Sequence, residues 1–184
     1  PNSSVGFLID DIDYSGQGGI ATLFDVDQVE VFRGPQGSRS GANALAGLIY
    51  IKTKDPTEKF EGTSELTLGD YGTQNIGIAF GGPMQNKKLK YRLVLRTDYA
   101  DGFRKNIYLN KSDTSKKDEL TLRYKLNWEL NETTNLDFLV SKVDMDDPAD
   151  IWTIDGSLNT LSDRPGMDSQ TTNSYGIKII KDFS

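Results

Sequence analysis

The chain of 184 residues contains neither cysteine nor histidine. Without cysteine it can form no disulfide and no thiolate metal site. Without histidine it lacks the commonest general base and the commonest metal ligand of proteins. These two absences argue against a zinc enzyme, a Ser-His-Asp hydrolase and a haem protein with a proximal histidine. We therefore expect no cofactor and no metal site built from cysteine or histidine.

Long apolar runs and an excess of positive charge are missing as well. No run approaches the roughly 18 apolar residues of a transmembrane helix, and the mean hydropathy is −0.51. The first ten residues lack the basic and apolar regions of a signal peptide. The formal net charge of −6 leaves no basic footprint for nucleic acid, so no nucleic-acid partner is expected. A low mean hydropathy is still compatible with a transmembrane β-barrel, whose strands alternate apolar and polar residues.

From residue 60 onward, apolar and polar residues alternate with the period of two that is typical of β-strands. The clearest run is ELTLRYKLNWEL (119–130), which places an apolar face opposite a charged one. Five similar runs precede or follow it, so we expect about six antiparallel strands. Helical patterns are scarce, and the two candidates are FDVDQ (24–28) and residues 38–45.

Two features favour strands of a transmembrane barrel over a soluble β-sandwich, in which alternation also occurs. The runs of roughly ten residues are longer than ordinary strands, and short and long connections alternate along the chain, as turns and loops do in outer-membrane barrels. Charge then orients the sheet, because an Arg or Lys facing mid-membrane lipid costs about 2–4 kcal/mol. The face that carries Arg123 and Lys125 must therefore point away from lipid, and the face of Leu122, Leu126 and Trp128 must point outward.

Residues 29–56, VEVFRGPQGSRSGANALAGLIYIKTKDP, place a glycine-rich turn between two strand-like runs. Such turns can cradle phosphate, but neither a Gly-Lys-Ser/Thr nor a G-x-G-x-x-G pattern is present, so we expect no nucleotide site. Together with VGFLIDDIDYS (5–15) and LFDVDQVEVFRGPQG (23–37), this stretch closely resembles the C-terminal half of the plug domain of TonB-dependent outer-membrane receptors. The run that ends in Arg33-Gly34-Pro35 is the most specific part of the resemblance.

The resemblance implies a mostly β fold in two parts. Residues 1–57 would be the C-terminal part of a plug domain, and residues 58–184 about six N-terminal strands of an incomplete transmembrane β-barrel. In this family the plug folds inside the barrel, and scarce ligands are taken up with energy delivered through TonB. We therefore expect a fragment of a transporter of the cell outer membrane, not an enzyme. Its expected partners are a small-molecule ligand, outer-membrane lipid and, through a missing N-terminal segment, TonB.

The resemblance also carries candidate site residues. The turn YSGQGG (14–19) aligns with an apical plug loop that faces incoming ligand, so Tyr14, Ser15 and Gln17 are expected ligand contacts. Glu30 and Arg33 are expected to contact the barrel wall. The chain departs from the family at residues 10–11, where Asp-Asp stands in place of the usual Asp-Gly.

An acidic stretch at 144–155, predicted to lie in the longest loop, is a second candidate site. Clustered carboxylates can bind Ca²⁺, although the EF-hand spacing is absent. Paired acids could serve glycoside hydrolysis, and a solvated loop is the third interpretation. Trp152, next to these acids, is a candidate contact for a sugar or a chelate. The alternative function is therefore a soluble all-β module that binds or cleaves carbohydrate with this loop. For a transporter, the sequence leaves iron–siderophore, cobalamin and oligosaccharide open as ligands.

Overall fold

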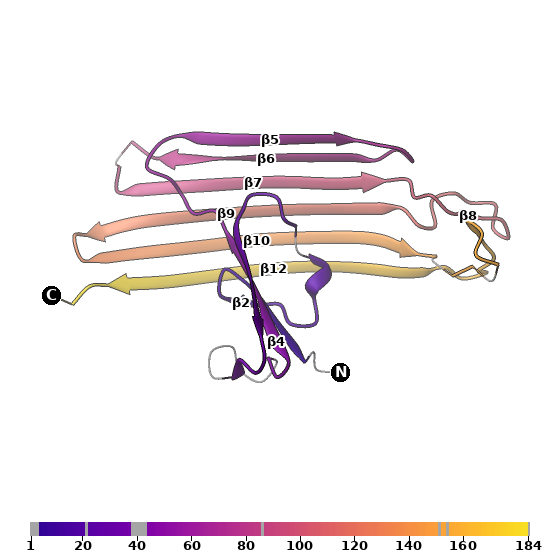
Figure 1. The fold of residues 1–184 in the computed structure, drawn as a ribbon. Coiled ribbons are helices and arrows are strands. Elements are labelled where there is room, and N and C mark those ends of the chain that lie inside the picture. Colours follow the sequence, from indigo (N-terminus) through magenta and orange to yellow (C-terminus); the bar gives the residue numbers. More distant parts are fainter. Residues whose placement is uncertain are drawn as a thin grey trace. The chain divides into compact units, whose positions relative to one another are not determined.

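The computed structural model describes residues 4–20, 22–37, 44–85, 87–150, 152–153 and 155–183. The chain separates into two compact units, Pro1–Asp55 and Pro56–Ser184, both built from β-strands (Figure 1). The element η1 (Gly18–Ile20) is a 3-10 turn. No helix among the described residues is long and apolar enough to cross a membrane.

The first unit is a four-stranded mixed sheet of β1 (Val5–Ile9), β2 (Ile12–Asp13), β3 (Val26–Arg33) and β4 (Gly47–Thr53). The strands lie in the order β2-β1-β4-β3, with β1 parallel and β3 antiparallel to β4. The central strand β4 supplies the core, where Leu48 and Ile51 are almost fully buried. β4 pairs along its length with β1 on one side and β3 on the other, and a strand flanked in this way is expected to bury its apolar residues.

The helix predicted at FDVDQ (24–28) is wrong. Asp25 adopts a left-handed conformation with φ of 60°, which turns the chain, and β3 begins at the next residue. The Asp25 carbonyl accepts a hydrogen bond from the Lys54 amide, which ties the start of β3 to the end of β4. Of the second predicted helix, 38–45, residues 38–43 lie outside the described residues.

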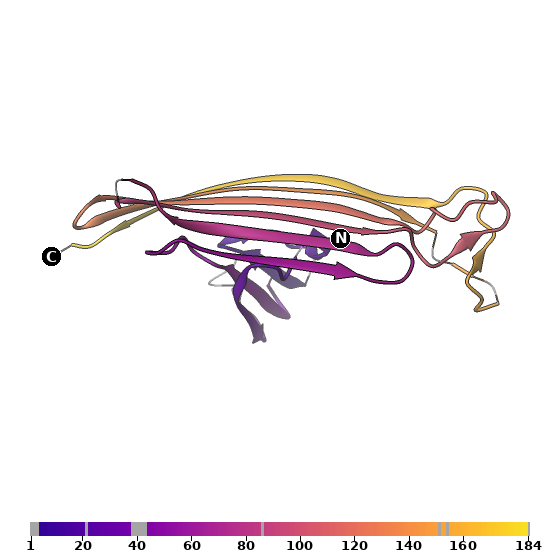
Figure 2. The same ribbon diagram turned by 90° about the horizontal axis from the view of Figure 1, so that it is seen from above.

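The second unit contains a six-stranded antiparallel sheet, which confirms the number and pairing predicted from the alternation (Figure 1). Neighbours along the chain are neighbours in the sheet, in the order β5-β6-β7-β9-β10-β12. Figure 2 shows this sheet from its edge, as a single curved layer. The strands are β5 (Glu61–Leu68), β6 (Gln74–Pro83), β7 (Leu89–Ala100), β9 (Lys117–Asn131), β10 (Thr134–Ala149) and β12 (Gly166–Lys181).

The two faces of this sheet differ in chemistry as the alternation predicted. On one face, which we call the apolar face, large apolar side chains are solvent-exposed: Ile76, Ile78, Leu93, Leu122, Trp128, Tyr175, Ile177 and Ile179. On the opposite face, which we call the charged face, basic side chains are almost completely buried: Lys90, Arg92, Arg123 and Lys125. This is the reverse of a water-soluble sheet, which buries apolar residues and exposes charges.

A repeated arrangement of acid, glycine and arginine crosses three strands on the charged face. Glu61 of β5, Gly81 of β6 and Arg92 of β7 are aligned in register. Because Gly81 has no side chain, the guanidinium of Arg92 extends across β6, and its Nη1 lies 3.3 Å from Glu61 Oε1. Arg92 is only 2% exposed, so this ion pair is largely removed from solvent on the arginine side.

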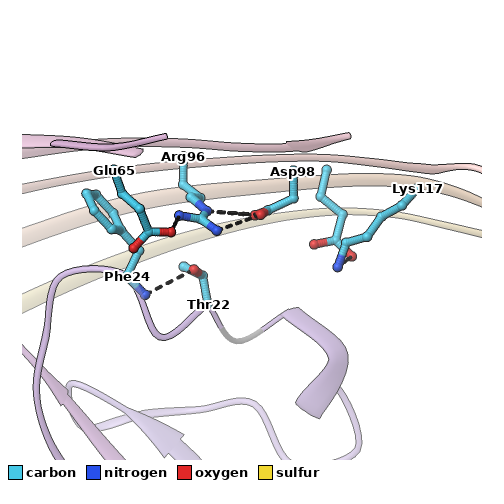
Figure 3. Close-up of polar contacts among 7 residues, drawn as sticks. Thr22, Phe24, Glu65, Arg96, Asp98 and Lys117 are labelled. Atoms are coloured by element: carbon cyan, nitrogen blue, oxygen red, sulfur yellow. Dashed lines mark hydrogen bonds and ion pairs between the residues drawn. The ribbon is translucent and has the colours of Figure 1, made fainter. Parts of the chain in front are cut away.

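The same arrangement recurs four residues further along β7. Glu65, Gly77 and Arg96 are aligned across β5, β6 and β7. Arg96 Nη1 lies 2.5 Å from Glu65 Oε1, and its Nη2 lies 2.8 Å from Asp98 Oδ1. Figure 3 shows the guanidinium held between these two carboxylates. The glycines of β6 therefore allow charged side chains to pair across a strand.

The acidic loop predicted at 144–155 is a strand over half of its length. β10 continues to Ala149 and pairs with β12 as far as Ala149↔Gly166, so Asp144, Asp146 and Asp147 belong to β10. The apolar alternation ends near Met145, which made the strand look too short in the sequence. The backbone hydrogen bonds to β12 continue beyond it, and they do not depend on side-chain polarity.

Candidate ligand-binding and transport site

The long connections 101–116 and 150–165 lie at one end of the six-stranded sheet (Figures 1 and 2). They join through two short parallel strands, β8 (Lys105–Asn106) and β11 (Asn159–Thr160). Phe103 and Tyr108 are exposed in the first connection, and Trp152 is 84% exposed in the second. Exposed aromatic side chains give large contact area with few rotamers to order, which suits ligand capture. The structure thus places the predicted contact Trp152 at a surface where it is accessible.

The acidic residues of 144–155 do not form a metal site. No group of three or more carboxylates in the described part of the chain is placed to hold a metal ion. Asp144 accepts a hydrogen bond from Thr171 Oγ1 and pairs with Lys142, while Asp155 caps the amide of Ser157. Each of these carboxylates therefore has a local partner.

The predicted apical contacts 14–17 have different environments in the structure. The Tyr14 side chain is 7% exposed, and its amide donates to the Phe7 carbonyl. Ser15 Oγ accepts a hydrogen bond from the Phe7 amide at 3.0 Å, so the hydroxyl oxygen is engaged within the sheet. Gln17 is exposed, its backbone amide donates to the Tyr14 carbonyl, and its carbonyl accepts a hydrogen bond from the Ile20 amide. Of the three, Gln17 has the side chain most accessible to a ligand.

Glu30 and Arg33, the predicted wall contacts, both lie on β3. Glu30 is half-buried opposite Tyr50, and Arg33 is exposed opposite Gly47 at the end of the strand. Their spacing of three residues places them on opposite faces of the strand. The structure does not bring them together within this sheet, and their contact with the barrel wall stays a prediction.

A carboxylate-rich turn at residues 10–11 was not predicted as a site. Asp10 and Asp11 connect β1 to β2 with φ of 49° and 68°, the left-handed conformation of a two-residue hairpin turn. The Asp10 carboxylate accepts hydrogen bonds from the Thr53 amide at 2.9 Å and from Thr53 Oγ1 at 2.6 Å. Asp11 Oδ1 accepts one from the Tyr50 hydroxyl at 3.1 Å. Aspartate tolerates this conformation because its short side chain bonds locally, so the Asp-Asp pair attaches the turn to β4.

The contacts of this turn raise the pKa of Tyr50. Partial burial, and then the charge and hydrogen bond of Asp11, raise the pKa of Tyr50 to about 12 from 10.0, with smaller effects of Asp10 and Glu30. Because the pKa of Tyr50 is higher in the folded protein than the value of 10.0 expected in the unfolded chain, the protonated side chain stabilises the fold. This contribution is fully present below pH 10 and is lost as the pH rises past about 12. Ultraviolet difference titration of the protein against its Tyr50→Phe variant measures this pKa. Asp11→Asn removes the charge and keeps an acceptor, so it should lower the pKa of Tyr50. An unchanged pKa in Asp11→Asn would contradict the assignment.

No protein-family model matches this chain. It is 25% identical over 158 residues to the vitamin B12 transporter BtuB of Vibrio vulnificus, covering 79% of this chain and 26% of the transporter. It is 30% identical over 101 residues to the pesticin receptor of Yersinia enterocolitica, covering 55% of this chain and 15% of the receptor.

The fold has a close counterpart among solved structures. The ferric yersiniabactin uptake receptor FyuA from Yersinia pestis matches 99% of this chain with a TM-score of 0.89 at 22% sequence identity. The match covers 30% of the solved receptor, so this chain spans less than a third of the length of the proteins described above. The curated relatives and the solved structure together point to the class of outer-membrane receptors. Within that class they point to a TonB-dependent receptor of the cell outer membrane, of which this chain covers a fragment.

Proposed function

We propose that the receptor to which this chain belongs actively takes up a scarce small molecule across the outer membrane, without catalysis and with energy delivered through TonB. The observation that carries the proposal is the inverted sheet, whose large apolar side chains are exposed and whose basic side chains are buried. Lipid is the environment that an exposed apolar strand face requires, and water or a polar interior suits the charged face. In this proposal residues 1–57 are part of the plug and 58–184 part of the wall.

The relatives support a metal chelate or cobalamin as the ligand class. Of the three proteins named above, one is a vitamin B12 transporter, one is an uptake receptor for ferric yersiniabactin, and the third is a pesticin receptor. We infer that the ligand is a large metal-containing chelate, and that Trp152 at the loop end and the turn with Tyr14, Ser15 and Gln17 contribute contacts to it. Gln17 and Trp152 have the exposed side chains that such contacts need.

A soluble carbohydrate module is not favoured by any described feature. A β-sandwich would cover the face of Leu93 and Leu122 with a second sheet, but both residues are over a third exposed. Three of the acids that such a module would use, Asp144, Asp146 and Asp147, lie in β10, and Asp144, Asp150 and Asp155 have local hydrogen-bond partners. We therefore do not retain this alternative.

Ligand uptake with and without an intact TonB complex tests the proposal. Cells that carry the full-length receptor are supplied with iron–siderophore, cobalamin and oligosaccharide tracers. We expect one metal-containing tracer to accumulate, and its accumulation to cease in the strain without TonB. Restoring TonB is the matched control. Equal uptake in both strains would remove TonB from the mechanism, and uptake of the oligosaccharide alone would overturn the inferred ligand class.

A further inference from the structure

The two long connections at the loop end share a buried carboxylate. Asp150, the first residue after β10, is 1% exposed, and Asn106 and Thr160 are completely buried beside it. Asp150 Oδ2 accepts hydrogen bonds from Asn106 Nδ2 at 2.8 Å and from Thr160 Oγ1 at 2.5 Å. Its Oδ1 accepts one from Ser162 Oγ at 2.8 Å. A buried carboxylate is expensive unless it is fully hydrogen-bonded, and here three donors from two different connections surround it.

Asn106 uses its whole side chain in the same cluster. Its Nδ2 also donates to the Ser162 carbonyl at 2.8 Å, and its Oδ1 accepts from the Leu109 amide at 2.8 Å. Both amide hydrogens and the carbonyl oxygen are therefore used. The amide group can donate twice to connection 150–165 and accept from its own connection at the same time.

Backbone hydrogen bonds cross between the connections around this cluster. The amides of Lys105 and Ile107 donate to the carbonyls of Leu158 and Thr160, each at 3.0 Å. In the opposite direction, the Asp150 amide donates to the Thr114 carbonyl at 3.1 Å. The two connections belong to different hairpins, because one joins β7 to β9 and the other joins β10 to β12.

The donors around Asp150 stabilise the ionised form of its carboxyl group. Burial would raise the pKa of Asp150, but the hydrogen bonds from Thr160, Ser162 and Asn106 outweigh burial and hold the pKa below its usual value. All three groups donate a hydrogen to the carboxylate. A charged acceptor makes each of these hydrogen bonds stronger than a neutral pair would be.

We propose that Asp150, Asn106, Thr160 and Ser162 form a loop clasp that joins connections 101–116 and 150–165 into one rigid body. Two loops of separate hairpins then move together, and a displacement of one is transmitted to the other. Asp150 and Asn106 are positioning residues in this proposal, since they act through the loops that they hold. The proposal goes beyond ligand uptake, and it can be tested without any ligand.

Hydrogen exchange of the full-length receptor in detergent tests the clasp. The reporters are the three amides that cross between the connections, those of Lys105, Ile107 and Asp150. Asn106→Asp keeps the size of the side chain but places a second carboxylate against Asp150, with no donor between them. We expect all three amides to exchange at least about tenfold faster. Two buried carboxylates with no donor between them destabilise the joined loops, and this cost corresponds to a tenfold or larger change in the equilibrium constant for loop opening. Amides at the centre of β9 and β10 should stay protected, which separates loop opening from failure to fold.

A double variant in which Asn106 and Asp150 exchange identities tests whether the lost protection can be rescued. Combining Asn106→Asp with Asp150→Asn places an amide opposite a carboxylate again, and we expect it to restore much of the lost protection. Asn110→Asp, an exposed change in the same connection, and Asp155→Asn, an exposed change in the other, are the matched controls and should leave all three amides protected. Faster exchange confined to one connection would overturn the clasp. A double variant as unprotected as Asn106→Asp would overturn the role of the amide–carboxylate pair.

Discussion

Replacing Leu126 with arginine is expected to prevent the receptor from assembling in the outer membrane. Leu126 lies on the apolar face of β9, between Tyr91 of β7 and Phe138 of β10 in the register of the sheet. An arginine at such a position faces lipid near mid-membrane, at a cost of about 2–4 kcal/mol. A net folding stability of about 5–15 kcal/mol leaves limited room for such a change. We therefore expect little folded receptor in outer-membrane fractions.

The change of Leu158 to arginine is the matched control for that experiment. Leu158 is an exposed leucine at the loop end, outside the six-stranded sheet, and it undergoes the same chemical change. We expect the Leu158→Arg receptor to assemble at the normal level, and Leu126→Met to do the same because it keeps the position apolar. The measurement is the amount of folded receptor in membranes. Gel electrophoresis of unboiled and boiled samples gives this amount, because the band of the folded receptor changes its migration on boiling. Normal assembly of Leu126→Arg would show that this face does not contact lipid.

Replacing Gly81 with alanine is expected to have the second largest effect, through backbone overlap. A Cβ at this position would lie 2.2 Å from the Tyr91 carbonyl oxygen and 2.9 Å from Arg92 Cα. These atoms belong to the backbone of β7, so β6 and β7 must separate locally. Overpacking of this kind costs about 1–3 kcal/mol or more, and we expect a value near the upper end. The separation would also move Arg92 away from Glu61, since Gly81 lies between them in register.

Gly69→Ala is the control for Gly81→Ala. Gly69 is exposed at the turn after β5, and a Cβ there would meet the Thr73 side chain at 3.3 Å. A surface change of this kind usually alters stability by about 0.5 kcal/mol or less. The midpoint of urea unfolding in detergent compares the two variants with the unmodified receptor. Equal midpoints for Gly81→Ala and Gly69→Ala would contradict the proposed backbone overlap.

The six-stranded sheet was predictable because its signal is local. Each strand records its own two faces in alternating residues, and Leu122 next to Arg123 is enough to tell the faces apart. The end of β10 was predicted too early because the strand continues on backbone hydrogen bonds to β12 after the alternation stops. The helix predicted at 24–28 failed for a similar reason, since the partner strand β4 decides the conformation there.

The candidate sites were harder to predict because they depend on residues distant in sequence. Asn106 and Asp150 are 44 residues apart, and no pattern in either connection indicates that they meet. Asp10 and Thr53 are 43 residues apart, although the Asp-Asp pair between Ile9 and Ile12 was a sign of a tight turn. The burial of Tyr14 could not be read from its position in a glycine-rich turn, since burial depends on the sheet around it.

The acid–glycine–arginine arrangements on the charged face have an electrostatic consequence for anything that moves along it. Arg92 and Arg96 are each matched by a carboxylate from a strand two positions away. Arg96 has a second carboxylate partner in Asp98. At these sites the positive charge of each guanidinium is therefore offset by at least one carboxylate, and the face does not present a row of uncompensated positive charges. The remaining potential falls quickly with distance, and water and salt screen it further. Under the proposed function, an anionic ligand that passes these pairs would be attracted less strongly than by unpaired arginines.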